Sequence, residues 1–478
     1  MKVMSNPSIS SSITVRLELP ARPTAVSELS SAVERAGGVL TALDITSSSA
    51  ERMQVDVTLS TRDSDHGDEI VEAMRSVEGV EIGKVSDRVF LSHLGGKLEV
   101  NSKVPIKNRD DLSLVYTPGV ARVCMAIAKN PADARSLTIK RNTVAVLTDG
   151  TAVLGLGDIG PLAALPVMEG KAALFKRFAG IDAFPICLDT KDTEEIIATA
   201  KAIAPVFAGI NLEDISAPRC FEIEERLRDE LAIPVFHDDQ HGTAIVVLAA
   251  LRNALRVVGK DLGEVRITMS GAGAAGTAIL KLLMLAGAQH VLVSDINGII
   301  HSGREDVSSD NVHLQWIAEH TNTDGVSGNL QDAIRDADVF IGVSAPNLLN
   351  GNDIQTMNKD AIVFALANPT PEVDPGEAAK YAAVVATGRS DFANQINNVL
   401  VFPGVFRGLI DAAASGVSDE VMLAAAKAVS DSVPDDELNA AYIIPSVFHR
   451  NLSQDVAAAV EAAARADMTA SESSGSTS

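Results

Sequence analysis

Two pairs of acidic residues each follow an apolar segment with the composition of a buried strand. The first pair is Glu213 and Asp214, and the second is Asp238 and Asp239. Parallel strands bring their carboxyl ends to one edge of a sheet, so the four carboxylates are expected to lie together. A divalent cation would offset their repulsion, and oxygen ligands favour Mg²⁺ or Mn²⁺ over Zn²⁺. Alternatively, the acids cap the helices that follow, although both members of both pairs could hardly do so.

Lys171 and Tyr116 are further candidates for chemistry because of their neighbours. Lys171 has apolar or small residues on both sides. A partly buried lysine facing a metal would have a depressed pKa, which suits a general base at neutral pH. The alternative is an ordinary solvated lysine. Tyr116 precedes a turn of Pro and Gly, where its phenol could donate a proton; the alternative is a packing role.

Two segments match the glycine pattern of dinucleotide-binding loops, residues 155–160 and 271–276. The second follows a predicted strand directly and opens an apolar helix, whose N-terminus would attract the pyrophosphate. The first runs into Pro161 and is expected to be a turn in the substrate domain. The sequence therefore predicts cofactor binding at Gly271, Gly273 and Gly276.

Asp295 ends the strand that follows this loop, about 20 residues beyond the glycines, where an acid can hydrogen-bond the adenosine ribose hydroxyls. An acid there opposes a 2′-phosphate, so NAD is expected. Arg304 is close to Asp295 in sequence and could bind the 2′-phosphate of NADP. NADP therefore remains the alternative.

The elements that position these residues alternate between strands and helices from residue 142 onward. This pattern predicts an α/β fold with a doubly wound sheet, comprising a substrate and metal domain over 91–240 and a Rossmann-type domain over 241–405. Residues 406–467 are Ala-rich and expected to be helical, and the tail 468–478 is expected to be disordered. The strands are expected at 143–147, 183–188, 205–210, 235–236, 265–270, 290–294, 339–343, 362–366 and 383–386.

Residues 1–90 are predicted to form a small domain of their own. The expected order is β-α-β-β-α-β, a ferredoxin-like pattern. Its size and its Gly37-Gly38 pair resemble an ACT-type ligand-sensing domain. An oligomerisation domain without a ligand is the alternative.

Composition limits the class of protein. With 46% hydrophobic but only 4% aromatic residues, the chain suits helices packed on parallel strands. A net charge of −23 argues against nucleic acid or an anionic membrane as partner. Three cysteines without metal-ligand spacing fit a reducing compartment. No signal peptide and no apolar run of membrane-spanning length is seen, so a cytoplasmic location is expected.

Taken together, these segments resemble malic enzyme of the compact bacterial type over about residues 93–410. The first ~90 residues lie outside the resemblance. The matching motifs occur in the family's order and are YTPGVA at 116–121, VLGLGDIG at 153–160, MEGK at 168–171, NLED at 211–214, FHDDQHGTA at 236–244, GAGAAG at 271–276, ALANPTPE at 365–372 and NNVLVFPG at 397–404.

The resemblance implies a role for each matching position. Tyr116 would be the proton donor and Lys171 the proton acceptor, with Asp238 assisting the lysine. The remaining implied residues are the metal ligands Glu213, Asp214 and Asp239, the substrate-binding residues Asn368 and Asn398, and the dinucleotide contacts Ala272, Gly273, Ala274 and Ala275.

One position departs from the family pattern. Larger malic enzymes have an arginine just before the LGLGD segment that holds a malate carboxylate, and Ala152 stands there in this chain. Arg389 is the candidate cation to replace it.

The activity that the resemblance implies is metal-dependent oxidative decarboxylation of (S)-malate to pyruvate and CO₂, with reduction of NAD. Alternatives are a malolactic or oxaloacetate-decarboxylating enzyme on the same site, an amino-acid dehydrogenase, or a decayed ligand-sensing protein. A homodimer or higher homo-oligomer is expected, in which Tyr116 acts in its own active site or in a neighbour's.

Overall fold

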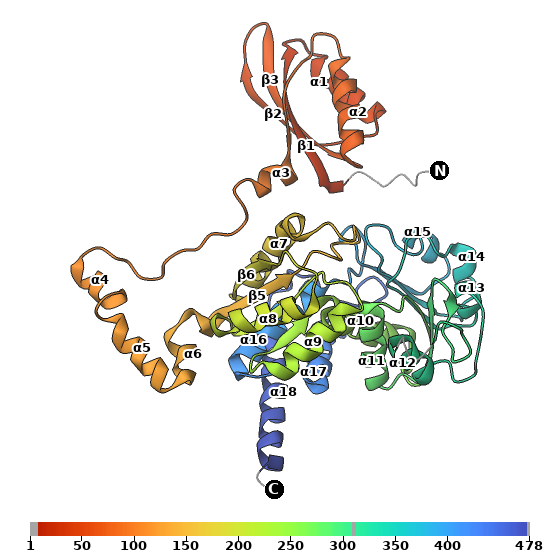
Figure 1. Cartoon of the computed structure of the whole chain (residues 1–478). Helices are drawn as coiled ribbons and strands as arrows, with labels where there is room; N and C mark the ends of the chain where they lie inside the picture. Colours follow the sequence, from red (N-terminus) through yellow and green to blue (C-terminus); the bar gives the residue numbers. More distant parts are fainter. Residues whose placement is uncertain (1–7, 308–311, 476–478) are drawn as a thin grey trace. The chain divides into compact units, whose positions relative to one another are not determined.

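The computed structural model describes residues 8–307 and 312–475. It divides the chain into two compact units, the first ending at Glu99 and the second beginning at Val100. Each unit has its own buried core. The fold class predicted from the sequence, a small βαββαβ domain ahead of α/β domains, is confirmed (Figure 1).

The first unit is an antiparallel sheet with two helices on one face (Figure 1). Its strand order is β2-β3-β1-β4. Alternate residues of β1, such as Val15 and Leu17, pack against Leu29 of α1 and Ile70 of α2. The opposite face carries charged pairs such as Arg16 with Asp56. The elements are β1 (Ser8–Pro20), α1 (Ala25–Arg35), β2 (Val39–Ser48), β3 (Arg52–Thr61), α2 (Ser64–Arg75), β4 (Glu81–Asp87) and α3 (Arg88–His93).

The second unit contains two sheets. The first is parallel, with the order β6-β5-β7-β8. Strand β5 is buried on both sides: Val144 and Val146 pack against α7 and α16, whereas Ala145 and Leu147 pack against α8 and α9. The elements are β5 (Thr143–Thr148), α7 (Pro161–Ala179), β6 (Asp182–Cys187), α8 (Thr193–Ile203), η3 (Ala204–Val206), β7 (Gly209–Leu212), α9 (Arg219–Glu230), β8 (Val235–His237) and η4 (Asp238–Gly242).

The second sheet has the order β11-β10-β9-β12-β13-β14 and is parallel except for β11. In β12, Val339 and Ile341 face α10 and α11, and Phe340 faces the opposite helical layer. The elements are α10 (Thr243–Val258), β9 (Arg266–Ser270), α11 (Ala274–Leu285), β10 (His290–Asp295), β11 (Gly298–Ile299), α12 (Val312–His320), α13 (Leu330–Ala333), β12 (Val339–Gly342), α14 (Gly351–Ile354), β13 (Ile362–Ala365), α15 (Pro375–Ala378) and β14 (Val384–Thr387).

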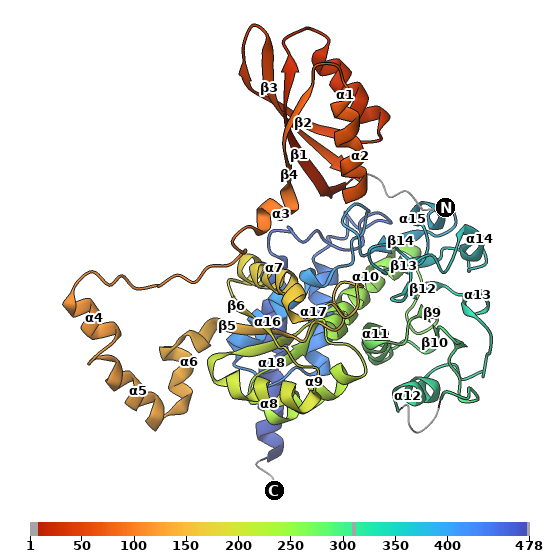
Figure 2. The same cartoon turned by 45° about the horizontal axis from the view of Figure 1, so that its top comes forward.

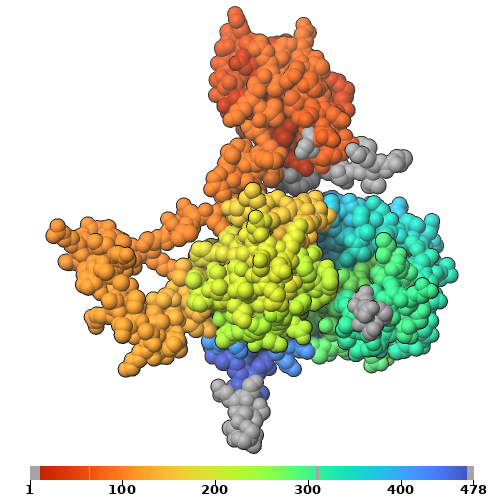
Figure 3. Space-filling view, in the orientation of Figure 1, coloured from red at the N-terminus to blue at the C-terminus, as the bar shows by residue number. Residues whose placement is uncertain are grey.

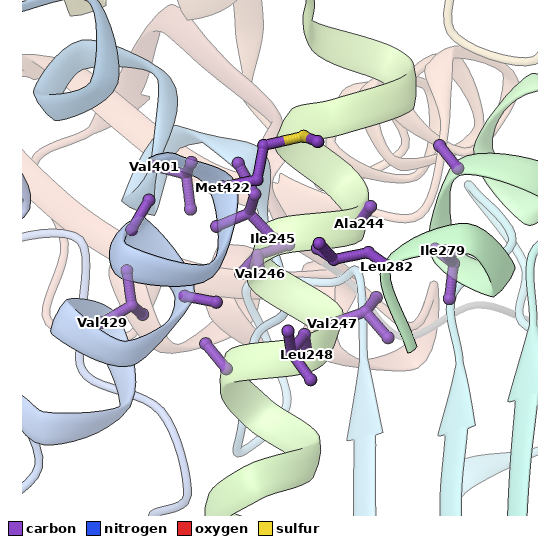
Figure 4. Close-up of a cluster of buried hydrophobic side chains, with 14 of the residues drawn as sticks. Ala244, Ile245, Val246, Val247, Leu248, Ile279, Leu282, Val401, Met422 and Val429 are labelled. Carbon is purple, nitrogen blue, oxygen red and sulfur yellow. The ribbon is translucent and has the colours of Figure 1, made fainter. Parts of the chain in front are cut away.

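Helix α10 joins the two sheets into one core. Its residues from Ala244 to Leu251 are all apolar and buried, as expected of a helix segment surrounded by protein. Figure 4 shows Ala244 to Leu248 between Leu282 of α11 and Met422 of α17. The parts that carry the two sheets consequently lie side by side (Figure 3). The C-terminal elements are η5 (Asn398–Leu400), α16 (Phe402–Ala412), α17 (Asp419–Asp431) and α18 (Leu452–Gly475).

The start of the second unit is an exposed helical arm, residues 100–142. No residue of α4, α5 or α6 is buried, and Figures 1 and 2 show α4 and α5 apart from the sheets. Arg135 joins the arm to α16 through a hydrogen bond to the Ile410 carbonyl (2.8 Å). The elements are α4 (Arg109–Val115), α5 (Val120–Lys129), η1 (Pro131–Asp133), α6 (Ala134–Leu137) and η2 (Ile139–Asn142).

Three details correct the sequence predictions. The strand predicted at 205–210 begins only at Gly209, because Pro205 lacks a backbone N–H and 204–206 form a 3₁₀ turn. The tail predicted to be disordered is helical to Gly475; residues 476–478 lie outside the described part.

The third correction concerns the prediction that no apolar segment reaches membrane-spanning length. Two helical stretches, Arg109–Lys129 and Asp238–Val258, are long and apolar enough to cross a membrane by length and composition alone. The second is 67% buried and contains the core helix α10, and a core helix passes the same test. The first contains α4 and α5, which are separated by a break at Thr117-Pro118.

Candidate active site

The predicted acids meet at the carboxyl edge of the first sheet. Glu213 and Asp214 follow β7, and Asp239 follows the neighbouring β8. One carboxylate oxygen from each of the three lies within 4.8 Å of the others. Asp214 has a positive φ of 54°, and its N–H donates to Asp239 Oδ2 (2.8 Å). The turn after β7 and the turn after β8 are thereby held together.

The electrostatics of this cluster suit a cation. Burial, followed by repulsion from Asp239 and Glu213, raises the pKa of Asp214 to about 8. Burial likewise raises the pKa of Glu213 to about 7, although Lys171 opposes the shift. The buried Oδ2 of Asp214 has no hydrogen-bond partner among the described residues. An all-oxygen cluster with an unpaired buried oxygen fits Mg²⁺ or Mn²⁺.

Lys171 lies in α7 with its ammonium between two of the acids. Nζ is 2.5 Å from Asp238 Oδ2 and 2.8 Å from Glu213 Oε1, and it lies 4.2 Å from the centroid of the Phe402 ring. A depressed pKa was expected for a lysine that faces a metal; in the chain alone the direction is the opposite. Burial lowers the pKa of Lys171, but attraction from Asp238, Glu213 and Asp239 outweighs burial and raises it.

Asp238 is fully buried in the turn η4, and burial raises its pKa to about 6. Its Oδ1 would be only 1.9 Å from a Cβ at Gly242, so a side chain there would require the Asp238 carboxylate to move. The same Cβ would lie 3.3 Å from Asn398 Cβ, which places Asn398 beside Asp238. The structure therefore brings Asn398 to the acids, as the sequence predicted.

The Asn368 backbone lies beside the first glycine loop, which connects β5 to α7, whereas its side-chain amide lies next to Gly388. In this loop the Ala152 N–H donates to the Asp214 carbonyl (3.0 Å). A Cβ at Gly155 would be 3.0 Å from the Asn368 carbonyl oxygen. The loop therefore links a predicted metal ligand to a predicted substrate residue.

The second glycine loop has the geometry of a dinucleotide site. It lies between β9 and the N-terminus of α11, and a Cβ at Gly276 would be 2.0 Å from the Gly271 carbonyl oxygen. A Cβ at Gly273 would meet nothing within 4 Å, so the backbone there is open to a ligand. These features fit a pyrophosphate at the helix N-terminus. Asp295 ends β10, the strand next to β9.

Two predicted residues are not brought to the acids. Tyr116 lies at the end of α4 and is 65% exposed, and none of the side-chain contacts within the described residues joins it to Lys171. Arg389 pairs with Asp391 (2.7 Å) and approaches the Pro369 carbonyl (3.4 Å), next to Asn368. It remains a candidate for the carboxylate-binding cation.

Three supporting groups at the site were not predicted from the sequence. Asp149 follows β5 at the same sheet edge and pairs with Arg219 (2.8 Å). Its position directly after an apolar segment could have indicated that it lies at this edge. Glu224 accepts hydrogen bonds from the His237 N–H and from the Gln240 side chain (both 3.0 Å) and so orients η4.

The third group, His313, places Nε2 2.7 Å from the Ala272 carbonyl of the cofactor loop. Its ring stacks on Phe221 of α9, with centroids 4.8 Å apart. Nothing in the local sequence indicated this contact.

A Rossmann-type sheet with a glycine loop, joined to a sheet whose edge holds a buried lysine and three carboxylates, is typical of a metal-assisted, dinucleotide-dependent enzyme. Residues 95–228 match the family model of the malic enzyme N-terminal domain, and residues 240–465 match that of the malic enzyme NAD-binding domain. The chain therefore belongs to the malic enzyme family.

Individual relatives agree with this assignment. A protein of Geobacillus stearothermophilus named NAD-dependent malic enzyme is 58% identical, covering 95% of this chain and 94% of the relative. A bifunctional malic/malolactic enzyme of Bacillus subtilis is 53% identical, covering 77% and 90%. The crystal structure of a Thermotoga maritima NAD-dependent malic enzyme has a TM-score of 0.76 at 46% identity, covering 79% of this chain and 99% of that chain.

Proposed function

We propose that the chain catalyses the metal-dependent oxidative decarboxylation of (S)-malate to pyruvate and CO₂, with NAD as hydride acceptor. The observation that carries this proposal is the position of Lys171, buried between Asp238 and Glu213 beside the three-carboxylate cluster. Family membership supports the reaction class.

The metal would be held by Glu213, Asp214 and Asp239, and it would supply Lewis-acid stabilisation of the developing oxyanion. Lys171 is proposed to take the proton of the malate C2 hydroxyl. Two of the three carboxylates that raise the pKa of Lys171 belong to the proposed metal ligands, so neutralising them lowers that pKa toward the range of a general base. Asp238 remains paired with Lys171 and orients its ammonium.

Substrate and cofactor are proposed to bind at the groups beside the acids. Asn368 and Asn398 would orient malate, and Arg389 would form an ion pair with one of the malate carboxylates. The loop 271–276 would hold the pyrophosphate. NAD rather than NADP is supported by the acid at Asp295 and by the NAD-dependent relative, although relatives named NADP-dependent also match at 43–45% identity.

Tyr116 is proposed to protonate C3 of enolpyruvate in the active site of a second copy of the chain. The helices beside it have no buried residues, and the arm exposes Leu112 (47%), Leu114 (76%) and Met125 (70%) to solvent. Covering such apolar side chains favours association. A homodimer in which the arms cross would bring Tyr116 to the partner's acids.

The N-terminal unit is proposed to be an ACT-like domain that binds a small effector or joins subunits. Its βαββαβ order supports the resemblance. A cytoplasmic location is proposed as well, supported by three cysteines that form no disulfide.

A malolactic activity on the same site is the second candidate. It is favoured by the 53% identity to the bifunctional malic/malolactic enzyme of Bacillus subtilis. Such an activity would convert malate to lactate without net NADH.

The test is an assay of malate with Mn²⁺ and either NAD or NADP, following NADH, pyruvate and lactate. We expect NADH and pyruvate in equal amounts, abolished by a chelator. Lys171→Ala should lower kcat by about 10²–10⁴, the usual cost of losing a general acid or base. Lys176→Ala is the matched control, because Lys176 lies on the same helix but pairs with Asp182 at the surface. Full turnover by Lys171→Ala would refute the assignment.

A further inference from the structure

The guanidinium of Arg304 lies against the end of β10, where the cofactor's adenosine ribose is expected. Its side chain is only 8% exposed. Asp295 and Gly298 face each other across the turn between β10 and β11, and Arg304 contacts both residues. The sequence alone left this arginine free to bind a 2′-phosphate, and the structure shows otherwise.

Every N–H of this guanidinium is already used. A guanidinium has five N–H donors. Nε donates to Asp306 Oδ1 (2.9 Å), Nη1 donates to Asp295 Oδ1 (2.9 Å) and to the Gly298 carbonyl (3.0 Å), and Nη2 donates to Asp295 Oδ2 (2.8 Å) and to Asp306 Oδ2 (2.5 Å). Two bidentate carboxylates and one carbonyl therefore occupy all five donors.

Asp295 keeps capacity to bind a ribose hydroxyl. Its Oδ1 accepts from Arg304 and from the Asn297 N–H (2.8 Å), whereas its Oδ2 accepts, among the described residues, from Arg304 alone. An ionised carboxylate offers about four acceptor positions, so Oδ2 can accept one more hydrogen bond. A 2′-phosphate would instead meet two carboxylates and one cation with no free donor.

We propose that Asp306 is a specificity-determining residue that excludes NADP by holding Arg304 away from the 2′ position. It acts through Arg304 and is therefore a positioning residue. Asn297 fixes Asp306 in turn, since its Nδ2 donates to Asp306 Oδ2 (3.0 Å). The proposal rests on cofactor binding at the loop 271–276 and does not depend on the reaction performed there.

The test measures dissociation constants for NAD and NADP with the full-length protein, by calorimetry and without malate. Asp306→Ala frees Nε and one N–H of Nη2, and charge-assisted hydrogen bonds from these to a phosphate should tighten NADP binding about tenfold or more. Binding of NAD, which has no 2′-phosphate, should change less than about threefold. Asp306→Asn keeps one acceptor and should give a smaller gain.

Two further variants separate this explanation from simpler ones. In Arg304→Ala/Asp306→Ala the gain for NADP should disappear, because the released donors are gone. Glu305→Ala removes the same charge from the exposed neighbouring residue, and it should leave NADP binding unchanged.

Three results would overturn the proposal. The first is an Asp306→Ala protein that binds NAD normally and shows no gain for NADP, and the second is an equal gain in Glu305→Ala. The third is a wild-type protein that binds neither nucleotide, which would remove the cofactor site itself. A protein that binds both nucleotides as predicted but does not oxidise malate would contradict only the proposed function.

Discussion

The charged residues at the edge of the first sheet are stable in the interior only as a set. Lys171 is 7% exposed and Asp238 is fully buried. A buried charge without a partner costs several kcal/mol, so removing either one leaves the other uncompensated. Burial raises the pKa values of Glu213 and Asp214, and the attraction of Lys171 is too weak to offset it.

The metal-free protein should therefore lose stability as the pH rises. Folding raises the pKa of Glu213 to about 7 and that of Asp214 to about 8, so these groups bind protons more tightly in the folded state. Their contribution to stability is full below the unfolded pKa of about 4 and is lost as the pH rises through 7 to 8. We expect a loss of a few kcal/mol between pH 5 and pH 8.5.

Thermal unfolding with a chelator present would measure this loss. Asp214→Asn should flatten the profile above pH 7, because it removes the group whose pKa is raised to about 8. Mn²⁺ should raise Tm more at pH 8 than at pH 5, since at low pH it must displace protons. Equal profiles for wild type and Asp214→Asn would contradict the assignment of the titrating group.

At the scale of residues, the sequence predicted where the site residues lie better than it predicted their pKa values. The acids that follow β7 and β8 were found because each pair comes after a recognisable apolar segment. In the chain alone the pKa of Lys171 is raised, because three carboxylates attract its ammonium, and the sequence could not show this arrangement. His313 was missed for a similar reason, since its partners Ala272 and Phe221 are distant in sequence.

At the scale of the elements, the turn η4 gives the adjacent residues Asp238 and Asp239 different partners. It directs Asp238 to Lys171 on α7, while Asp239 accepts from the Asp214 N–H after β7. Two adjacent residues thus serve two different partners. A side chain at Gly242, the glycine that ends the turn, would displace the Asp238 carboxylate.

Gly242→Ala should consequently damage catalysis more than stability. The new Cβ would be 1.9 Å from Asp238 Oδ1, so the carboxylate must move. A displacement of about 1 Å in an active site can cost about 10²-fold, and we expect kcat to fall by that much or more. Steady-state kinetics and thermal unfolding of the same sample would test this.

Gly170→Ala is the matched control. Gly170 lies inside α7 next to Lys171, and a Cβ there meets nothing within 4 Å. Alanine should stabilise the helix by up to about 1 kcal/mol and leave kcat unchanged. If both variants lost the same activity, the position of Asp238 would not be the cause.

Elements with a strong local signal were predicted closely. Strand β5 occupies Thr143–Thr148, within one residue of the predicted 143–147, since residues 144–147 form a continuous apolar segment that is fully buried. Strand β7 was misplaced because an apolar composition does not reveal the turn at Pro205. The order of strands across the two sheets depends on long-range packing through α10 and was not accessible from local patterns.

At the scale of the whole molecule, the prediction concerns which chain supplies the proton donor, Tyr116, to each active site. Lys171, the acids and Asn398 come from one chain and lie together, but Tyr116 ends an exposed helix of the arm. Closed dimers have two-fold symmetry, so an arm that reaches the partner's site implies the reverse contact as well. Each dimer would then contain two active sites, each built from both chains.

A heterodimer of two inactive variants tests this arrangement. Tyr116→Phe and Lys171→Ala should each be inactive alone, because each removes one proton-transfer group from every site. Carrying different tags, the two variants can be co-expressed and the heterodimer isolated. If Tyr116 acts in the partner's site, one of the two sites combines the intact Tyr116 of one chain with the intact Lys171 of the other, and about half of wild-type activity should return. If Tyr116 acts within its own chain, both sites stay defective and no activity returns.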